Sequence, residues 1–454
     1  MQNLDFKTES VIFEVPVRMI MTVSIVICAL TCLVMILGVL FVPKIKLGRL
    51  ELSSYWVVST IGALLLIALG QADVKEIGDA LIANTAINPL KILILFISMT
   101  ILSIYLDELG FFRYLAYRTL RYAGTNQKKL FLFLYLTVSF LTVFTSNDII
   151  ILSFTPFICY FAKNAKIDPI PYLAAEFVAA NTWSMALVIG NPTNIYLATA
   201  NGIDFIGYLT VMILPTLVSG LAAFLLLYFV FYKRISAPIS SAVAEPCHIE
   251  DHTSLFIGLI HLGVCTVILA ISSYVGVEMW LVAGLSVVSL FICSAVLSLV
   301  RRKSNGNMRG CLKRAPWQLI PFVLSMFVMT IVLTGKGVTA SIGSFLGDEY
   351  TLFRYGFSSF FAANVINNIP MSVLFCSIME SAGAGAITKA VYATIVGSNV
   401  GAFMTPIGAL AGIMWSSILN HHGLKFGYLD FLKIGVTIAI PTLCVALLVL
   451  EVII

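Results

Sequence analysis

Charged residues are scarce in this sequence. They make up 11% of its 454 residues, whereas about 25% is usual in a globular protein, and hydrophobic residues reach 60%. So few charges cannot cover a water-facing surface, which excludes a soluble enzyme, a disordered chain, a coiled coil and a disulfide-stapled secreted domain. The remaining class is an all-α polytopic membrane protein, in agreement with the mean hydropathy of +1.01.

Several functional motifs are also missing. The nine cysteines form no CxxC pair, so neither a disulfide framework nor a zinc site is indicated. No metal site or cofactor is predicted, although the polar residues crowded in one stretch are either a solvated loop or a metal or metalloid site, namely Cys247, His248, Glu250, Asp251 and His252. No Walker motif occurs, so an ATPase subunit would have to be a separate chain. No basic stretch interleaved with aromatic residues suggests nucleic-acid binding. No histidine accompanies a serine in the polar stretches described below, which argues against a membrane enzyme.

Long apolar runs are abundant, and a membrane span needs about 20 apolar residues. Besides ten uninterrupted or nearly uninterrupted spans, which are given below, two apolar runs, 129–163 and 353–381, are broken in the middle by polar residues. Each of these two runs is either two spans or a re-entrant hairpin. Backbone that breaks at mid-membrane needs protein or water around it, which favours the hairpins. The ten expected spans are 19–42, 53–70, 89–106, 171–201, 206–232, 254–273, 277–300, 317–335, 386–421 and 428–452.

Lysine and arginine set the expected orientation. With ten spans and two hairpins, 20 of the 27 basic residues fall on the side opposite the N-terminus. Basic residues accumulate on the cytoplasmic side, so a multi-pass plasma (inner) membrane protein with both termini outside is predicted. Charge alone also allows the first interrupted run to be two spans. The other seven basic residues are Lys7, Arg18, Lys75, Lys91, Lys336, Arg354 and Lys389.

The two halves of the sequence resemble each other. Asn147-Asp148 aligns with Asn367-Asn368 at an offset of 220, and four residues around the fourth span align at an offset of 218. Those four are Val178, Asn181, Ile189 and Gly190, which match Val396, Asn399, Ile407 and Gly408. Because five spans is an odd number, the predicted domains are membrane repeats 1–235 and 254–454 in inverted orientation, joined by a cytoplasmic linker, 236–253. Inverted repeats with interrupted helices are typical of secondary transporters.

Polar residues interrupt both hairpins and both broken spans. Proline and glycine stop a helix there, while Asn, Ser and Thr can cap the half-helices and bind a ligand. Half-helix ends meeting at mid-depth would offer N–H groups to an anion and carbonyls to a cation. The predicted substrate- and ion-binding residues are Thr145, Ser146, Asn147, Asp148, Asn181, Gly190, Asn191, Thr193, Asn194, Asn364, Asn367, Asn368, Ser398, Asn399 and Thr405.

Two acidic residues are candidates for ion coupling. Asp148 lies inside an apolar run, where an ionisable residue indicates function unless it only caps a helix over 149–163. Glu176 lies inside the fourth span, where it is either a second coupling acid or an interfacial acid near Lys163 or Lys166.

These motifs resemble the arsenite and antimonite efflux permeases of the ion transporter superfamily, which also holds citrate and sodium-dicarboxylate carriers. The matching segments are Thr145-Ser146-Asn147-Asp148 through Thr155-Pro156, Ala363 through Pro370, and Gly397-Ser398-Asn399 through Trp415. The carriers hold sodium and carboxylates with Ser-Asn-Thr at both tips. This chain instead has Ser146-Asn147-Asp148 and Asn367-Asn368-Ile369, which weakens a dicarboxylate assignment.

The resemblance implies export of arsenite, antimonite or a related small anion. Export of an uncharged hydroxide against its gradient needs a coupled ion, for which Asp148 or Glu176 could carry the proton. Export of an anion could instead use the membrane potential. Two alternatives stay open, namely uptake of an organic anion with sodium or protons, and sodium/proton exchange.

Overall fold

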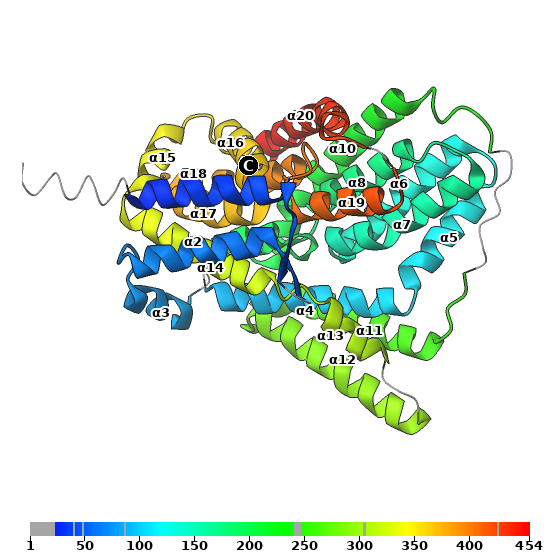
Figure 1. Cartoon of the computed structure of the whole chain (residues 1–454), viewed down its shortest axis with the longest axis horizontal. Helices are drawn as coiled ribbons and strands as arrows, with labels where there is room; N and C mark the ends of the chain where they lie inside the picture. The colour runs from blue at the N-terminus through cyan, green and yellow to red at the C-terminus, as the bar shows by residue number, and fades with distance from the viewer. Residues whose placement is uncertain are drawn as a thin grey trace, which may run out of the picture.

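The computed structural model describes residues 23–39, 41–47, 50–85, 88–239, 247–302, 306–424 and 426–454. Figure 1 shows long helices running mostly along one direction. The apolar runs expected to span the membrane form helices or broken helices, which confirms the all-α polytopic membrane class. Parts of the first span and of the linker, together with Lys7, Arg18, Arg49, Lys303 and Lys425, lie outside the described residues.

The single-helix spans match the apolar runs closely, and the two interrupted spans form pairs of shorter helices. Helices of 18 residues or more with the required hydropathy occur in seven stretches of the described chain, and Val23–Val39 and α2 are apolar but shorter. The elements are the helix Val23–Val39, α2 (Ser54–Ala68), α4 (Pro89–Glu108), α8 (Ile170–Trp183), η1 (Val188–Gly190), α9 (Pro192–Ala200), α10 (Phe205–Phe231), α11 (His252–Val275), α12 (Met279–Arg301), α14 (Leu319–Gly335), α18 (Ala384–Gly401), α19 (Leu410–His421) and α20 (Tyr428–Ile453).

Both interrupted runs form helical hairpins. The first consists of α6 (Gln127–Phe144) and α7 (Asn147–Ala165), and the second of α16 (Thr351–Ile366) and α17 (Asn368–Met379). Two residues separate the helices at the first tip and one at the second, so the polar residues lie at the turns, as the sequence indicates.

Some elements were not expected. β1 (Lys44–Leu47) and β2 (Leu50–Ser53) form a small antiparallel hairpin, in which Lys44 and Glu51 make a 3.0 Å ion pair. Four short helices were also missed because they are too short or too polar to resemble spans. They are α3 (Val74–Ile82), α5 (Phe111–Ala123), α13 (Gly306–Arg314) and α15 (Val338–Leu346).

The order of elements is the same in the two halves of the chain. In each half one long helix, α4 or α14, stands between two short helices. A hairpin, a broken helix and a final long helix follow in that order. The halves are also intertwined. Helix α4 packs on α11, α12 and α13, α14 packs on α2, and α10 packs along α20 (Figure 1).

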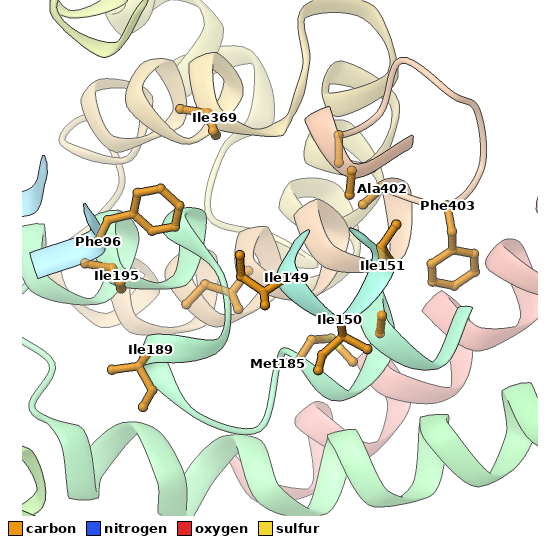
Figure 2. Close-up of a cluster of buried hydrophobic side chains, with 14 of the residues drawn as sticks. Phe96, Ile149, Ile150, Ile151, Met185, Ile189, Ile195, Ile369, Ala402 and Phe403 are labelled. Atoms are coloured by element: carbon orange, nitrogen blue, oxygen red, sulfur yellow. The ribbon is translucent and has the colours of Figure 1, made fainter. Parts of the chain in front are cut away.

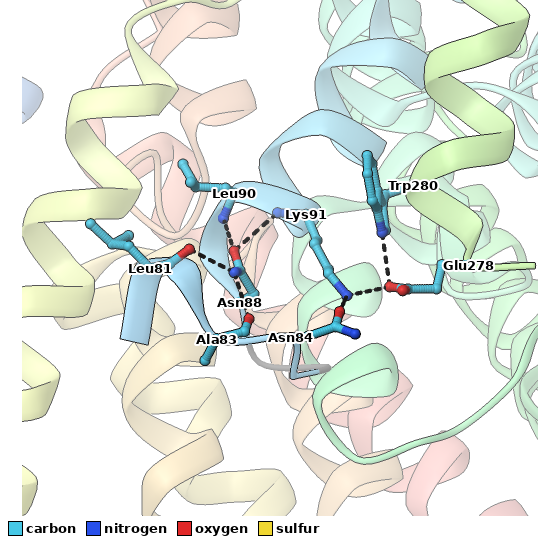
Figure 3. A network of polar contacts seen from close by, with 8 residues as sticks. All are labelled: Leu81, Ala83, Asn84, Asn88, Leu90, Lys91, Glu278 and Trp280. Atoms are coloured by element: carbon cyan, nitrogen blue, oxygen red, sulfur yellow. Dashed lines mark hydrogen bonds and ion pairs between the residues drawn. The ribbon is translucent and has the colours of Figure 1, made fainter. Parts of the chain in front are cut away.

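Ion pairs join both ends of α4 to the second half. At its start, Lys91 Nζ lies 2.5 Å from Glu278 Oε2, and at its end Arg314 bonds Asp107 at 2.6 Å and Glu108 at 2.7 Å. Figure 3 shows the first network, in which Lys91 also contacts Asn84 and Trp280 donates to Glu278. We call the two ends of α4 the Lys91 face and the Arg314 face of the molecule.

Close approach of α16 and α18 depends on glycine. A Cβ at Gly397 would lie 2.1 Å from Ser359 Oγ and 2.3 Å from the carbonyl oxygen of Gly356. Gly401, one turn later, approaches the backbone of Phe360 in the same way. Small residues at such spacing let membrane helices pack backbone to backbone. This contact fixes the second hairpin against the broken span α18–α19.

Candidate functional site

The tip of the first hairpin carries polar atoms without partners. Thr145 Oγ1 bonds back to the Leu141 carbonyl at 2.7 Å, and Asn147 Nδ2 donates to Asn181 Oδ1 at 3.0 Å. Ser146 Oγ and Asn147 Oδ1 are buried and accept or donate no hydrogen bond among the described residues. Thr182 follows Asn181 in α8, and its Oγ1 is also buried without a hydrogen-bond partner among the described residues. Buried polar groups are normally paired, so an unpaired group of this kind calls for an explanation such as a ligand.

The first broken span supplies a well-bonded turn beside that tip. Asn191 caps α9 by accepting from the Thr193 amide at 3.1 Å, and Pro192 begins the helix without needing a donor. Asn194 Nδ2 donates to the Ser184 carbonyl at 2.8 Å. Gly190 is required here, because a Cβ would lie 2.4 Å from that same carbonyl oxygen.

Helix α18 of the second half closes over this turn. Asn399 Oδ1 accepts from Ser184 Oγ at 2.8 Å and from Asn191 Nδ2 at 3.0 Å, while its Nδ2 donates to Asn194 Oδ1 at 2.6 Å. Ser398 Oγ donates to Thr193 Oγ1 at 3.0 Å. The four predicted residues Asn191, Asn194, Thr193 and Asn399 therefore meet, but they saturate one another.

The tip of the second hairpin is bonded within its own half. Asn364 Oδ1 accepts from Thr405 Oγ1 at 2.6 Å, and Asn364 Nδ2 donates to the Gly401 carbonyl at 3.0 Å. Asn367 Nδ2 donates to the Ile407 carbonyl at 3.0 Å, and the backbone N–H of Asn368 donates to the Gly408 carbonyl at 3.1 Å. Asn367 has φ of +73°, a conformation that asparagine tolerates better than most residues.

Apolar side chains surround these breaks (Figure 2). Ile149, Ile150 and Ile151 follow the first tip directly, and Met185 and Ile189 belong to the first broken span. Ile369 follows the second tip. All are buried, so the polar breaks lie inside an apolar shell to which both halves contribute.

Asp148 does not cap a helix. Helix α7 begins at Asn147 with Ser146 at the N-cap position and without a side-chain capping bond. The Asp148 carboxylate is half-buried in the first turn, and within the described chain it makes no hydrogen bond or ion pair. Tyr55 of α2 lies near enough to interact with it electrostatically. Sequence reasoning missed Tyr55, since nothing in its local pattern sets it apart.

Glu176 is not an interfacial acid. Its side chain is fully buried, where both carboxylate oxygens accept from Thr155 Oγ1 at 2.9 and 3.1 Å, and Oε2 also accepts from Trp415 Nε1 at 3.3 Å. Neither Lys163 nor Lys166 is a partner. Thr155 and Trp415 stand in the segments that carry the family resemblance, but their contact with Glu176 joins α7, α8 and α19 and could not be inferred from spacing.

A cavity opens on each side of the broken helices. On the Arg314 face a cavity of about 750 Å³ follows one side of α7, with Leu152 and Pro156 in its wall. These residues stand four and eight positions after Asp148, on the same side of the helix. On the Lys91 face a cavity of about 350 Å³ ends at Thr199, in the last turn of α9.

The acid on the Lys91 face is held ionised. The hydrogen bond from Lys91, followed by one from Trp280, lowers the pKa of Glu278 below its ordinary value despite some desolvation. A metal site finds no support, because no three His, Cys, Asp or Glu side chains come together in the part of the chain that is described.

Known proteins resemble this chain over most of its length. An arsenical pump membrane protein of Escherichia coli is 27% identical over 406 residues, covering 86% of this chain and 91% of that protein. An arsenical pump membrane protein of Yersinia enterocolitica is 28% identical, covering 78% and 84%. The crystal structure of the Alcanivorax borkumensis YdaH transporter shares the fold, with a TM-score of 0.54, 14% identity and coverage of 95% and 98%.

A family model described as citrate transporter (CitMHS) matches residues 11–397. That match covers far more than half of the sequence. Together with the arsenical pump relatives it confirms the expected superfamily, so this chain is a membrane transporter that belongs to the citrate transporter family, within the ion transporter superfamily.

Proposed function

We propose that this protein is a secondary active transporter that exports arsenite, antimonite or a related small oxyanion. The observation that carries the proposal is the presence of buried polar atoms without partners on Ser146 and Asn147 at the first hairpin tip, and on Thr182 of α8, together with the Asp148 carboxylate, which has no partner in the described chain. These groups could hydrogen-bond a small hydroxide or oxyanion. The relatives named arsenical pump membrane proteins support the same substrate class.

The charge of the buried residues favours an uncharged or weakly charged substrate. No lysine, arginine or histidine is buried in the described chain, and Glu176 is its only buried aspartate or glutamate. A citrate-like substrate would bring several negative charges into a region without a compensating cation. The helix N-termini of α7, α9, α17 and α19 begin at the breaks and offer only partial positive charge.

Coupling of export to protons or to the membrane potential is part of the proposal. Asp148 and Glu176 are carboxylates without a cationic partner, so each can exchange a proton or a cation during transport. Alternating access would open the first tip to the cavity on the Arg314 face and then to the cavity on the Lys91 face. An ATPase subunit, if one participates, would act from the Arg314 face.

Organic anion transport coupled to sodium or protons is the second candidate, which the citrate transporter description supports. Sodium/proton exchange, with Asp148 binding the cation, is the third. A substrate panel in inverted vesicles, with a pH gradient and a potential imposed separately, tests all three. Arsenite uptake driven by either gradient would support the proposal. Citrate uptake without arsenite uptake, or sodium exchange alone, would contradict it.

The inverted arrangement of residues 1–235 and 254–454 is likewise a proposal, motivated by the matching order of elements. A single cysteine at Lys166 should label from the cytoplasm and one at Gly383 from outside, since both positions are exposed near hairpin ends. Labelling of both from the same side would contradict the inverted repeat.

A further inference from the structure

Helix α5 carries a concentration of positive charge that no acid neutralises. Its 13 residues include Arg113, Arg118 and Arg121 and no acidic residue. Lys129 is the third residue of the next helix, α6. Among the residues that the structure describes, none of these four side chains forms an ion pair, whereas Arg234, Arg301 and Arg314 are each paired with aspartate or glutamate.

The position of α5 explains how it can carry such charge. The helix is too short to span a membrane, and it follows directly after the Arg314-face end of α4. Its buried residues Phe112, Ala116, Leu120 and Ala123 recur at helical spacing, so one side packs on the protein while Arg118 and Arg121 lie on the other side. Arg113 lies at the edge, where it lines the cavity on the Arg314 face. This is the pattern of an amphipathic helix that lies in the membrane interface.

Arg118 is held in place but keeps its charge. Its guanidinium donates to Tyr122 Oη at 2.8 Å and to Tyr114 Oη at 3.3 Å, and it lies 5.2 and 5.9 Å from the centres of those rings. Two tyrosine hydroxyls occupy only part of its five N–H donors. The remaining donors can bind an anion.

A groove lies beside these cations, between α5 and α6. Thr119, Tyr122, Phe133 and Thr137 line a cavity of about 320 Å³. The two threonine hydroxyls bond each other at 2.9 Å, so methyl groups and rings are left to face a ligand. Lys129, Phe133 and Thr137 stand at four-residue intervals, which places Lys129 above the groove on one side of α6.

The α6 residues next to Phe133 and Thr137 in sequence present an exposed apolar surface. Leu132, Leu136 and Phe140 of α6 are exposed by 37%, 50% and 66%. An apolar groove that opens onto such a surface and has unpaired cations at its rim suits a ligand with one anionic end and one apolar end. A soluble anion would use the cations but not the groove.

We infer that the α5–α6 surface is a binding site for an anionic phospholipid. Its phosphate lies against Arg118, Arg121 and Lys129, and an acyl chain occupies the groove lined by Phe133 and Thr137. Basic clusters of this kind beside membrane helices bind anionic headgroups. The inference does not depend on which substrate the protein transports.

The test measures binding of phosphatidylglycerol to the full-length protein. Purified protein is placed in phosphatidylcholine nanodiscs with increasing phosphatidylglycerol, and bound lipid is counted by native mass spectrometry. Arg121→Gln/Lys129→Gln is the main variant, because neither side chain makes a bond that the fold would lose. We expect its apparent affinity to fall by about tenfold or more. The control is Arg309→Gln/Lys433→Gln, which removes two other exposed, unpaired basic residues.

A second variant tests the groove. Thr137→Phe fills the cavity without changing charge, and we expect it to weaken phosphatidylglycerol binding. Its control is Thr137→Val, which also removes the bond to Thr119 but leaves the cavity open, and which should bind phosphatidylglycerol as the unchanged protein does. Equal loss in the control pair would show that only net charge matters and would overturn the site. Full competition by inorganic phosphate, or unchanged lipid binding in both the Arg121/Lys129 variant and Thr137→Phe, would also overturn it.

Discussion

The two hairpin tips hold corresponding places in the chain but bond their polar side chains differently. At the second tip, Asn364 and Asn367 are bonded to the turn of their own broken span. At the first tip, Ser146 Oγ and Asn147 Oδ1 have no partner among the described residues, and an acid, Asp148, stands where the second tip has Asn368. A tip whose residues Asn364 and Asn367 are bonded to the neighbouring turn can serve as a rigid support, whereas a tip with unpaired polar atoms can bind a ligand. The comparison therefore divides structural and binding roles between the halves.

The largest effect is expected when the first tip is made like the second. Asp148→Asn cannot titrate but keeps the side-chain size, so accumulation of substrate against a gradient should be lost while downhill exchange survives. Transport in vesicles with and without a pH gradient measures both. Asp168→Asn, a partly exposed acid paired with Arg234, is the control. Uphill transport with an unchanged pH profile in Asp148→Asn would remove the coupling role from this residue and leave Glu176 to be tested.

Substitutions of Asn147 at the first tip and Asn367 at the second tip should have different effects on transport and stability. Asn147→Ala should weaken transport by about 10- to 100-fold, since it removes ligand-binding groups, and it should lower the melting temperature less than Asn367→Gly does, since it removes only one bond, to Asn181. Asn367→Gly suits the positive φ but removes two bonds, so it should lower the melting temperature and retain part of the transport activity. Equal loss of stability in the two variants would break the proposed division of roles.

A loss of stability of intermediate size is expected when the bond between Trp415 and Glu176, which joins the two halves, is removed. Trp415→Phe keeps the ring packed against Phe177 but removes the N–H donor, which should cost about 1–3 kcal/mol of stability because a buried carboxylate loses a partner. Glu176→Gln should restore much of that loss in the double variant. Thermal unfolding in detergent measures both, and additive losses would argue against a direct Trp415–Glu176 interaction.

The smallest effect is expected at the Lys91 face. The pKa of Glu278 is lowered in the folded protein, so its contribution to stability is present above its ordinary pKa and is lost as the pH falls through the lowered value. Because the pair is partly exposed, Glu278→Gln should cost less than about 1 kcal/mol near neutral pH. Melting curves between pH 3 and pH 7 should show a smaller dependence on pH in this variant than in the unchanged protein.

The elements were easier to predict than the contacts of the site. Apolar length identifies spans such as α10 and α20, and runs of Asn, Pro and Gly mark where helices break, because these features are local in sequence. The pairing of Asn399 with Asn191 and Asn194 is not local, since more than 200 residues separate the partners. The same limit applies to Glu176 and Trp415, which lie 239 residues apart. The short helix α5 is missed for another reason, because its three arginines lower its mean hydropathy although one side of the helix is buried.

The intertwining of the halves constrains how the protein is made. Helix α4 emerges early in synthesis, but its C-terminal acids Asp107 and Glu108 find their cation only when Arg314 has been made, some 200 residues later. Its N-terminal Lys91 must likewise wait for Glu278. Until then, α4 and α10 pack only on helices of the first half, and their contacts with α11, α12, α13 and α20 cannot form. Insertion of the first half therefore yields an intermediate that needs protection from misassembly, and tertiary folding is completed only after the ribosome has delivered the last helix.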